Sequence, residues 1–235
     1  MDVVAMHMSD GLINAPTSLL FGAVAAAGLA IALWRARTEL DERTAPMAGL
    51  VAAFVFALQM VNFPILPGVS GHVLGGALAA ILVGPYTGAL CLAIVLIVQA
   101  LLFADGGLSA LGANITNIAL IGVATGYGIA VALRPLLRGR TRGRGLAVVS
   151  FTAALAAVVA ASAGFLLEYA IGGASTTSLG TVAAYLLGTH VLIGVGEGIV
   201  TAATVAAVAR ARPDLVYLLR TAPRPAPAPA SDVAA

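Results

Sequence analysis

Long runs of apolar residues, separated by short segments that hold the charges and most turn residues, form the main pattern of this chain. A helix needs about 20 consecutive apolar residues to cross a bilayer. Seven runs are predicted as helices, at about 16 to 35, 46 to 66, 72 to 83, 86 to 103, 112 to 133, 146 to 171 and 179 to 209. The pattern predicts an all-α, polytopic integral membrane protein with about seven transmembrane helices.

The third run, from His72 to Val83, is too short to cross a bilayer upright. We expect it to be a half-span, or to form a bent pair with the fourth run around Gly84 and Pro85. A backbone that ends inside the hydrocarbon must be shielded by protein, because lipid offers its polar groups no hydrogen bonds. The sixth and seventh runs exceed the required length, so we expect them to tilt or to project beyond the membrane.

The composition agrees with this class. The chain has 235 residues, of which 60% are hydrophobic and 9% charged, and its mean hydropathy is +1.03. Soluble domains average about a quarter charged residues, so a soluble globule is excluded. All twelve basic residues are arginine, and the absence of lysine excludes an ATP-binding loop of the Walker type. A single cysteine, Cys91, excludes a disulfide within the chain.

The arginines predict the orientation, because short loops rich in basic residues stay in the cytoplasm. They fall into three groups: Arg35, Arg37 and Arg43; Arg134, Arg138, Arg140, Arg142 and Arg144; and Arg210, Arg212, Arg220 and Arg224. With seven crossings these groups share one face, while the alternate segments carry no base. We therefore expect the N-terminus outside, the C-terminus in the cytoplasm, and a multi-pass protein of the cell membrane.

The predicted domain organisation has three parts. Residues 6–210 form a single transmembrane helical domain, and residues 211–235 form a cytoplasmic tail rich in proline and alanine. Residues 1–5 are interpreted as an extension or as the result of a misassigned start. The first residues lack the basic start, apolar stretch and cleavage site of a secretory signal peptide.

Three histidines are the main candidates for chemistry. By the predicted topology, His7 and His72 lie at the same extracellular face and can meet. If translation begins at Met6, the Met6 amine, the His7 amide nitrogen and the His7 imidazole can close two fused chelate rings around a divalent cation, with His72 as a fourth ligand. Such a nitrogen-rich, near-planar set suits Ni(II), Cu(II) or low-spin Co(II) better than magnesium or calcium.

The third histidine, His190, lies in the seventh run with Glu197 on roughly the same helical face. It need not join the other two histidines. We interpret His190 and Glu197 as a buried pair that satisfies itself, in preference to a proton relay.

The remaining polar residues have structural interpretations beside functional ones. Asp10 and Ser70 can each accept a hydrogen bond that orients one of the two imidazoles. Equally, Asp10 suits a turn and Ser70 suits a helix cap. Asn114, Asn117 and Gln99 are expected to form interhelical hydrogen bonds or caps, although both asparagines can reach the same cavity. Asp105 is expected to stabilise an external turn, although near the mouth of the site it can also attract cations.

Four stretches resemble the CbiM/NikM family, whose members are the substrate-binding membrane subunits of energy-coupling-factor importers for cobalt or nickel. They are residues 6–11 (MHMSDG), 68–85 (GVSGHVLGGALAAILVGP), 99–114 (QALLFADGGLSALGAN) and 190–198 (HVLIGVGEG). The resemblance covers nearly everything from Met6 to about Arg210. It implies that the terminal amine, the amide and imidazole of the second residue and a later histidine hold the metal, which maps onto Met6, His7 and His72.

The resemblance also implies the partners and the energy source. A transmembrane coupling subunit would bind this chain, paired cytoplasmic ATPases of the ABC type would supply the energy, and a small accessory membrane subunit is left open. Neither a nucleic acid partner nor a permanently bound cofactor is expected, because Ni(II) or Co(II) is the transported substrate. The choice between nickel and cobalt is also left open.

One departure from the family pattern concerns the start of the chain. Met1 to Ala5 precede the motif, and a chain that begins at Met1 leaves Met6 without a free amine. An internal start at Met6 is therefore the expectation.

Two other classes of function are considered. The first is a secondary transporter that is driven by an ion gradient and uses the intramembrane residues Glu168, His190 and Glu197. The second is an intramembrane enzyme, which is disfavoured because the sequence shows neither paired carboxylates nor an activated nucleophile. Neither alternative accounts for His7 and His72 together.

Overall fold

The computed structural model describes residues 7–42, 44–66, 69–137 and 142–220. The chain begins with helices α1 (Ala15–Ala36) and α2 (Ala45–Gln59), a hairpin of strands β1 (Asn62–Leu66) and β2 (Val69–His72), and helices α3 (Gly76–Val83) and α4 (Pro85–Leu102). A nearly continuous helix follows, made of α5 (Leu111–Asn114), the π-helical stretch η1 (Ile115–Gly122) and α6 (Val123–Ala132). After the short turn η2 (Arg134–Leu137) come the long helices α7 (Arg142–Gly172) and α8 (Leu179–Ala211), then η4 (Pro213–Leu215) and α9 (Tyr217–Arg220).

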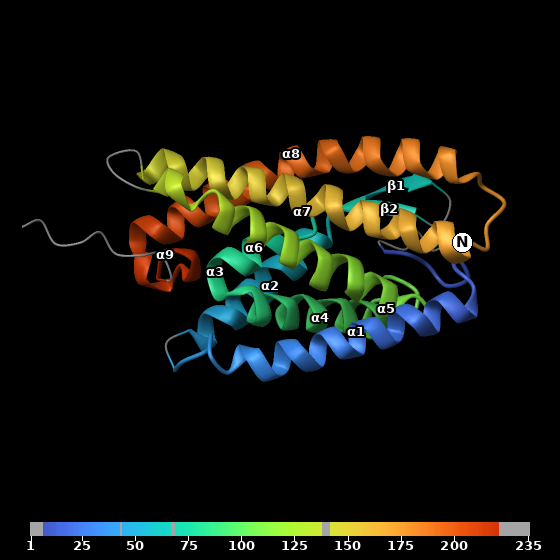
Figure 1. Cartoon of the computed structure of the whole chain (residues 1–235), viewed down its shortest axis with the longest axis horizontal. Helices are drawn as coiled ribbons and strands as arrows, with labels where there is room; N and C mark the ends of the chain where they lie inside the picture. Colours follow the sequence, from blue (N-terminus) through green and yellow to red (C-terminus); the bar gives the residue numbers. More distant parts are fainter. Residues whose placement is uncertain (1–6, 43, 67–68, 138–141, 221–235) are drawn as a thin grey trace, which may run out of the picture.

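The all-α membrane class is confirmed. Within the described residues, five helical segments are long and apolar enough to cross a membrane: α1, α4, the α5–η1–α6 helix, α7 and α8. Helix α2 is apolar but has only 15 residues, and α3 has eight. The long helices lie side by side, with the hairpin at one end of the bundle and α9 at the other (Figure 1).

The predicted second helix, 46 to 66, is wrong in its last third. Helix α2 ends at Gln59, and residues 62–66 form β1, which pairs antiparallel with β2. Pro64 explains the difference, because proline cannot donate to a helical hydrogen bond and disfavours a helical conformation at the preceding residue. The third run is shortened at its start for a related reason, since His72 closes the hairpin opposite Asn62 and α3 begins only at Gly76.

Helices α3 and α4 form the expected bent pair. Gly84 separates them with a φ of +102°, a left-handed conformation that glycine adopts without strain. The Glu39 carboxylate, which is buried, lies against this turn and accepts hydrogen bonds from the backbone N–H groups of Tyr86 and Thr87 at 3.2 and 2.6 Å. These bonds satisfy two of the free N–H groups at the start of α4.

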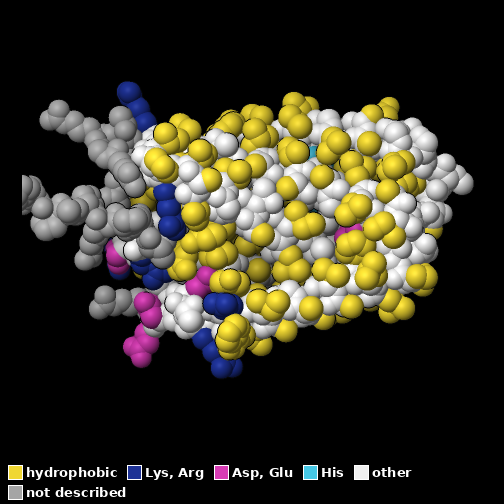
Figure 2. Space-filling model, viewed as in Figure 1, with side chains coloured by type: hydrophobic (Ala, Val, Ile, Leu, Met, Phe, Trp, Pro, Cys, Tyr) yellow, Lys and Arg dark blue, Asp and Glu magenta, His cyan; other side chains and the backbone are white. Residues whose placement is uncertain are grey.

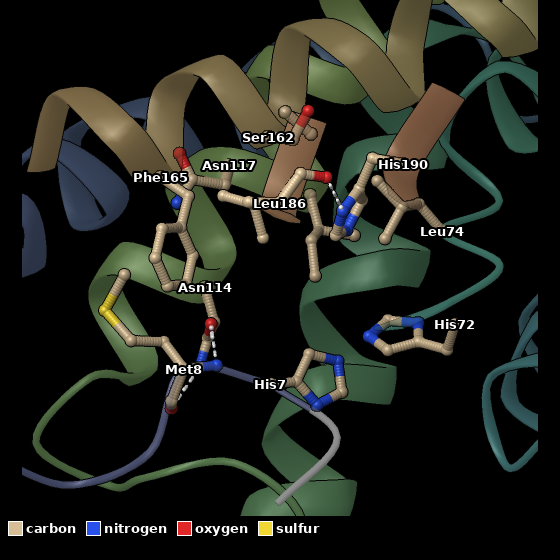
Figure 3. Close-up of a pocket in the computed structure, with 12 residues that line it drawn as sticks. His7, Met8, His72, Leu74, Asn114, Asn117, Ser162, Phe165, Leu186 and His190 are labelled. Carbon is tan, nitrogen blue, oxygen red and sulfur yellow. Dashed lines mark hydrogen bonds between the residues drawn. The ribbon is translucent and has the colours of Figure 1, made fainter. Parts of the chain in front are cut away.

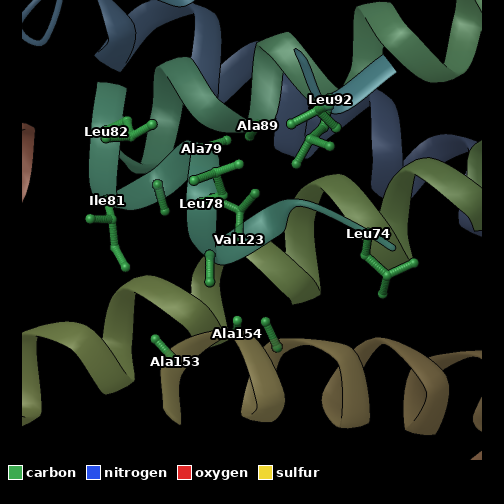
Figure 4. Close-up of a cluster of buried hydrophobic side chains, with 14 of the residues drawn as sticks. Leu74, Leu78, Ala79, Ile81, Leu82, Ala89, Leu92, Val123, Ala153 and Ala154 are labelled. Atoms are coloured by element: carbon green, nitrogen blue, oxygen red, sulfur yellow. The ribbon is translucent and has the colours of Figure 1, made fainter. Parts of the chain in front are cut away.

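Helix α3 lies at the centre of the bundle, and all eight of its residues are buried (Figure 4). Close packing depends on small residues. A Cβ atom on Gly76 would lie 2.9 Å from the Gly122 carbonyl carbon, and one on Gly126 would lie 2.7 Å from the Cα atom of Ala77. Glycine therefore lets the α5–η1–α6 helix approach α3 at backbone distance, as is common in membrane bundles. The protein shields this half-span, as its length requires.

The surface separates apolar and basic residues. Hydrophobic side chains cover the length of the face in Figure 2, while the arginines gather at one end, where α1 ends and α7 begins. Large exposed apolar residues include Leu19, Leu33 and Trp34 of α1. The expectation that the arginine-bearing segments share one face is confirmed for the described arginines, and the hairpin lies at the opposite end (Figure 1).

Candidate metal site

The segment that precedes α1 is held inside the end of the bundle opposite the arginines. Met8 is 1% exposed, and its backbone binds the side chain of Asn114 at two points: the Met8 N–H donates to Oδ1 at 3.0 Å, and Nδ2 donates to the Met8 carbonyl at 3.1 Å (Figure 3). The Gly107 N–H donates to the same carbonyl at 2.9 Å. Asp10 accepts from the backbone N–H and the hydroxyl of Ser109 at 2.7 and 2.6 Å. The loop before α5 therefore fixes the position of His7.

His7 and His72 lie next to each other, as the topology predicts. Their ring centroids are 4.5 Å apart and the rings are inclined by 56° (Figure 3). His7 is 5% exposed and His72 is 3% exposed, so both imidazoles are buried. One arrives on the N-terminal segment and the other on β2. Met6, the third predicted site residue, lies outside the described residues.

Each ring has an oxygen atom beside its Nδ1 atom. Nδ1 of His72 lies 2.8 Å from the Val73 carbonyl oxygen, and Nδ1 of His7 lies 3.4 Å from Oδ1 of the buried Asp105. A carbonyl oxygen only accepts, so the His72 ring carries a hydrogen on Nδ1. The Nε2 atom of His7 is buried and has no hydrogen-bond partner among the described residues. Imidazole nitrogens are common metal ligands, and this end of the bundle brings two imidazoles together.

A cavity of about 40 Å³ adjoins both rings. Its wall also contains Met8, Leu74, Asn114, Asn117, Ile118, Ala161, Ser162, Phe165, Leu186 and His190 (Figure 3). A cavity needs about 10–15 Å³ to hold one water molecule, so this one has space for a small ion. Half of the twelve lining residues are apolar, and their low polarity strengthens electrostatic interactions inside the cavity.

Known proteins are similar to this chain over most of its length. Residues 7–215 match the CbiM family, described as the cobalt uptake substrate-specific transmembrane region. The chain belongs to the CbiM family. The cobalt transport protein CbiM of Sorangium cellulosum is 34% identical over 222 residues, which are 92% of this chain and 96% of that protein. The fused nickel transport protein NikMN of Rhodobacter capsulatus is 32% identical over 233 residues, which are 95% of this chain and 66% of that protein.

A solved structure is similar as well. The crystal structure of a transition metal transporter superposes with a TM-score of 0.76 at 27% identity, over 88% of this chain and 93% of that one. This CbiM-family chain is therefore a multi-pass membrane protein of the cobalt and nickel uptake type, and its named relatives are metal transport proteins.

The interpretation of His190 and Glu197 as a mutually satisfied pair is wrong. His190 Nδ1 bonds the Leu186 carbonyl of its own helix at 2.8 Å, while Glu197 accepts from the backbone N–H groups of Leu74 and Gly75 at 2.6 and 3.0 Å. Two turns of helix separate the residues, so each meets a different neighbour. His190 also lines the same cavity as His7 and His72, although the sequence had not placed it there.

The two asparagines have different roles in this CbiM-family chain. Asn117 donates from Nδ2 to Glu168 at 2.7 Å, so the predicted interhelical hydrogen bond is confirmed. Asn114 was expected to do the same, but it binds the Met8 backbone instead. An amide inside an apolar run was the only signal in the sequence, and it does not identify a partner 106 residues away.

The acidic loop residues also differ in part from expectation. Asp105 was expected to stabilise a turn, with the attraction of cations as the alternative, and its carboxylate lies 3.4 Å from Nδ1 of His7. Among the described residues, Asp10 has no hydrogen bond to an imidazole. It bonds Ser109, whose hydroxyl and backbone N–H lower the pKa of the Asp10 carboxyl from its usual value. Ser70 lies in β2 and does not cap α3, whose N-cap is Gly75.

Proposed function

We propose that this chain is the substrate-capture membrane subunit of an ATP-driven, energy-coupling-factor importer of divalent nickel or cobalt. The observation that carries the proposal is the pair of buried imidazoles whose centroids lie 4.5 Å apart beside a small cavity, next to the N-terminal segment. Relatives named as cobalt and nickel transport proteins support the choice of metals.

The proposed ligands are the Met6 amine, the His7 amide nitrogen, the His7 imidazole and the His72 imidazole. Ring geometry specifies which atom of His7 takes part. From the amide nitrogen, the path through Cα, Cβ and Cγ to Nδ1 closes a six-membered ring with the metal, whereas Nε2 lies too far round the imidazole. Since Nδ1 of His7 lies against Asp105, capture requires this ring to exchange its Asp105 contact for the cation.

The chelate requires a free amine on Met6, so the proposal includes a mature chain that starts there. Residues 6–210 then form the functional membrane domain, with the N-terminus outside and the tail from residue 211 in the cytoplasm. Metal binding displaces protons from the amine, the amide and the imidazoles. Copper binds nitrogen sites more tightly than nickel or cobalt, so selectivity must come from rigid geometry and metal supply.

The energy source in this proposal is external to the chain. The sequence contains no lysine for a nucleotide-binding loop, so cytoplasmic ABC-type ATPases act through a transmembrane coupling subunit that docks against the bundle. Neighbouring genes give an inexpensive test, because cobalamin biosynthesis genes indicate cobalt and urease genes indicate nickel.

Metal binding by the purified protein tests the capture step. We expect stoichiometric Ni(II) or Co(II) binding by the wild type, and its loss in His7→Ala and in His72→Ala without loss of folding. Retention of stoichiometric metal by both variants would overturn the ligand assignment. Terminal sequencing of protein made from its native gene tests the start at Met6, and an extended mature terminus with full metal occupancy would contradict the chelate.

A further inference from the structure

The segment between β2 and α3 carries His72 and is held by two buried side chains from other helices. Glu197 of α8 accepts from the N–H groups of Leu74 and Gly75 at 2.6 and 3.0 Å. Gln59 of α2 donates from Nε2 to the Leu74 carbonyl at 2.8 Å. Glu197 and Gln59 are each 0% exposed. Both the N–H and the carbonyl group of Leu74 are therefore fixed by the bundle.

One peptide group connects Glu197 to the His72 ring. The Val73 carbonyl, which lies 2.8 Å from Nδ1 of His72, belongs to the same planar peptide as the Leu74 N–H that donates to Glu197. A carboxylate on the N–H side polarises the peptide and makes its carbonyl a better acceptor. Glu197 therefore strengthens the hydrogen bond between the Val73 carbonyl and Nδ1 of His72, and so fixes the orientation of that ring.

The glycine at the end of the segment allows this arrangement. Gly75 has a φ of +82°, and a Cβ atom there would lie 2.8 and 2.9 Å from the two Cγ atoms of Val55. The backbone can therefore turn through the left-handed region and present two successive N–H groups to one carboxylate. Glu197, Gln59 and Gly75 come from three parts of the chain and act on the same few atoms.

We propose that Glu197 is a positioning residue for metal capture, which acts on His72 through the Val73–Leu74 peptide and shares this task with Gln59. The inference rests on the function proposed above and deepens it, because it identifies how the bundle orients the second histidine. Neither side chain is required to contact the metal.

The experiment compares Ni(II) binding by the purified full chain in the wild type, Glu197→Gln, Gln59→Met and Glu39→Gln. A glutamine at position 197 offers one acceptor and turns its amide hydrogens toward the other N–H group. The Glu39 variant is the matched control, because that buried carboxylate also accepts from two successive N–H groups, but at the arginine-rich end. The measurements are the Ni(II) dissociation constant, the visible absorption spectrum of bound Ni(II) and the melting temperature.

We expect Glu197→Gln and Gln59→Met to weaken Ni(II) binding by about 10- to 100-fold, the range found for residues that orient metal ligands. The spectrum of the bound Ni(II) should shift, because one ligand is no longer held in the same orientation. Glu39→Gln should lower the melting temperature and leave the Ni(II) affinity and spectrum unchanged. If Glu197→Gln does not fold, the Ni(II) affinity and spectrum of Gln59→Met alone test the positioning role.

The failure of this inference can be distinguished from failure of the proposed function. A wild type that binds no Ni(II) or Co(II) refutes the proposed function. Loss of binding in His72→Ala, combined with wild-type affinity and spectrum in both Glu197→Gln and Gln59→Met, refutes only the positioning role. An equal loss of affinity in Glu39→Gln also refutes that role, because it attributes the effect to general destabilisation.

Discussion

Asn114 binds the N–H and the carbonyl group of Met8 with the two atoms of its amide, at 3.0 and 3.1 Å. This arrangement makes Asn114 a two-point link between helix α5 and the residue that follows His7. We predict that Asn114→Leu weakens Ni(II) binding by about 10- to 100-fold, because the segment that carries His7 is no longer fixed. Hydrogen exchange of the Met8 amide, measured with the dissociation constant, should become faster in the same variant.

The control for this variant lies two residues further along the chain. Thr116 is also buried, and its hydroxyl donates to the Phe21 carbonyl of α1 at 3.3 Å without contacting the N-terminal segment. Thr116→Val should keep the wild-type Ni(II) affinity and the wild-type exchange rate at Met8. Unchanged exchange in Asn114→Leu would show that other contacts are sufficient to hold the segment.

A substitution at Gly84 tests the bent pair of α3 and α4. A Cβ atom there would lie 2.6 Å from the carboxyl carbon of Glu39, and the φ of +102° is strained for any residue with a side chain. We expect Gly84→Ala to destabilise the protein by about 1–3 kcal/mol, measured by thermal unfolding in detergent. Gly49→Ala in α2 meets no atom within 4 Å and should be neutral or stabilising.

The buried carboxyl group of Glu39 should make the stability of the protein depend on pH. Burial raises its pKa from the usual value, and this effect outweighs the hydrogen bonds from Thr87 and Tyr86. The pKa of Glu39 is higher in the folded state than in the unfolded state, so protonated Glu39 favours the folded state. This contribution to the free energy of unfolding is fully present below the unfolded-state pKa and is lost as pH rises through the folded-state pKa. Between pH 4 and pH 8, the melting temperature of the wild type should therefore fall relative to that of Glu39→Gln. A constant difference between the two proteins would contradict this assignment.

Metal binding should depend on pH in the opposite direction. The proposed chelate releases protons from an amine, an amide and two imidazoles, so Ni(II) affinity should increase as pH rises from 6 to 8. Calorimetry in buffers of different ionisation enthalpy counts the released protons. Release of less than one proton at pH 7 would be incompatible with a chelate that includes the deprotonated His7 amide.

His190 provides a further test of the ligand set. It lines the cavity, but its Nδ1 atom is bonded to its own helix and it is not one of the four proposed ligands. We expect His190→Ala to retain stoichiometric Ni(II) and to change the affinity less than either His7→Ala or His72→Ala. Complete loss of bound metal in His190→Ala would require a different set of ligands.

The sequence predicts the helices and the meeting of two histidines better than it predicts the contacts that hold them. The apolar runs and the positions of the arginines can be read directly from the sequence. The topology that they predict brings His7 and His72 together. The partners of Asn114 and Glu197 lie 106 and 123 residues away along the chain, and they are backbone groups, which leave no trace in residue type. Tertiary packing alone creates these contacts.

The end of α2 is a second case in which the sequence predicts the helix but not the contact that follows it. Pro64 indicates that a helix cannot continue smoothly, but hydropathy alone extends the run to residue 66. The hairpin that replaces the last turns of helix depends on pairing with β2, whose residues lie three to ten positions further along the chain than their partners. Periodicity within one segment carries no information about such a partner.

The size of the cavity has a consequence for the form in which an ion enters it. The cavity of about 40 Å³ exceeds the roughly 10–15 Å³ that a single water molecule needs, so it leaves little space around an ion bound to both imidazoles. Under the proposed function, capture would be an exchange of water ligands for nitrogen ligands, and the rate at which the ion gives up its hydration water would set an upper limit on the speed of loading.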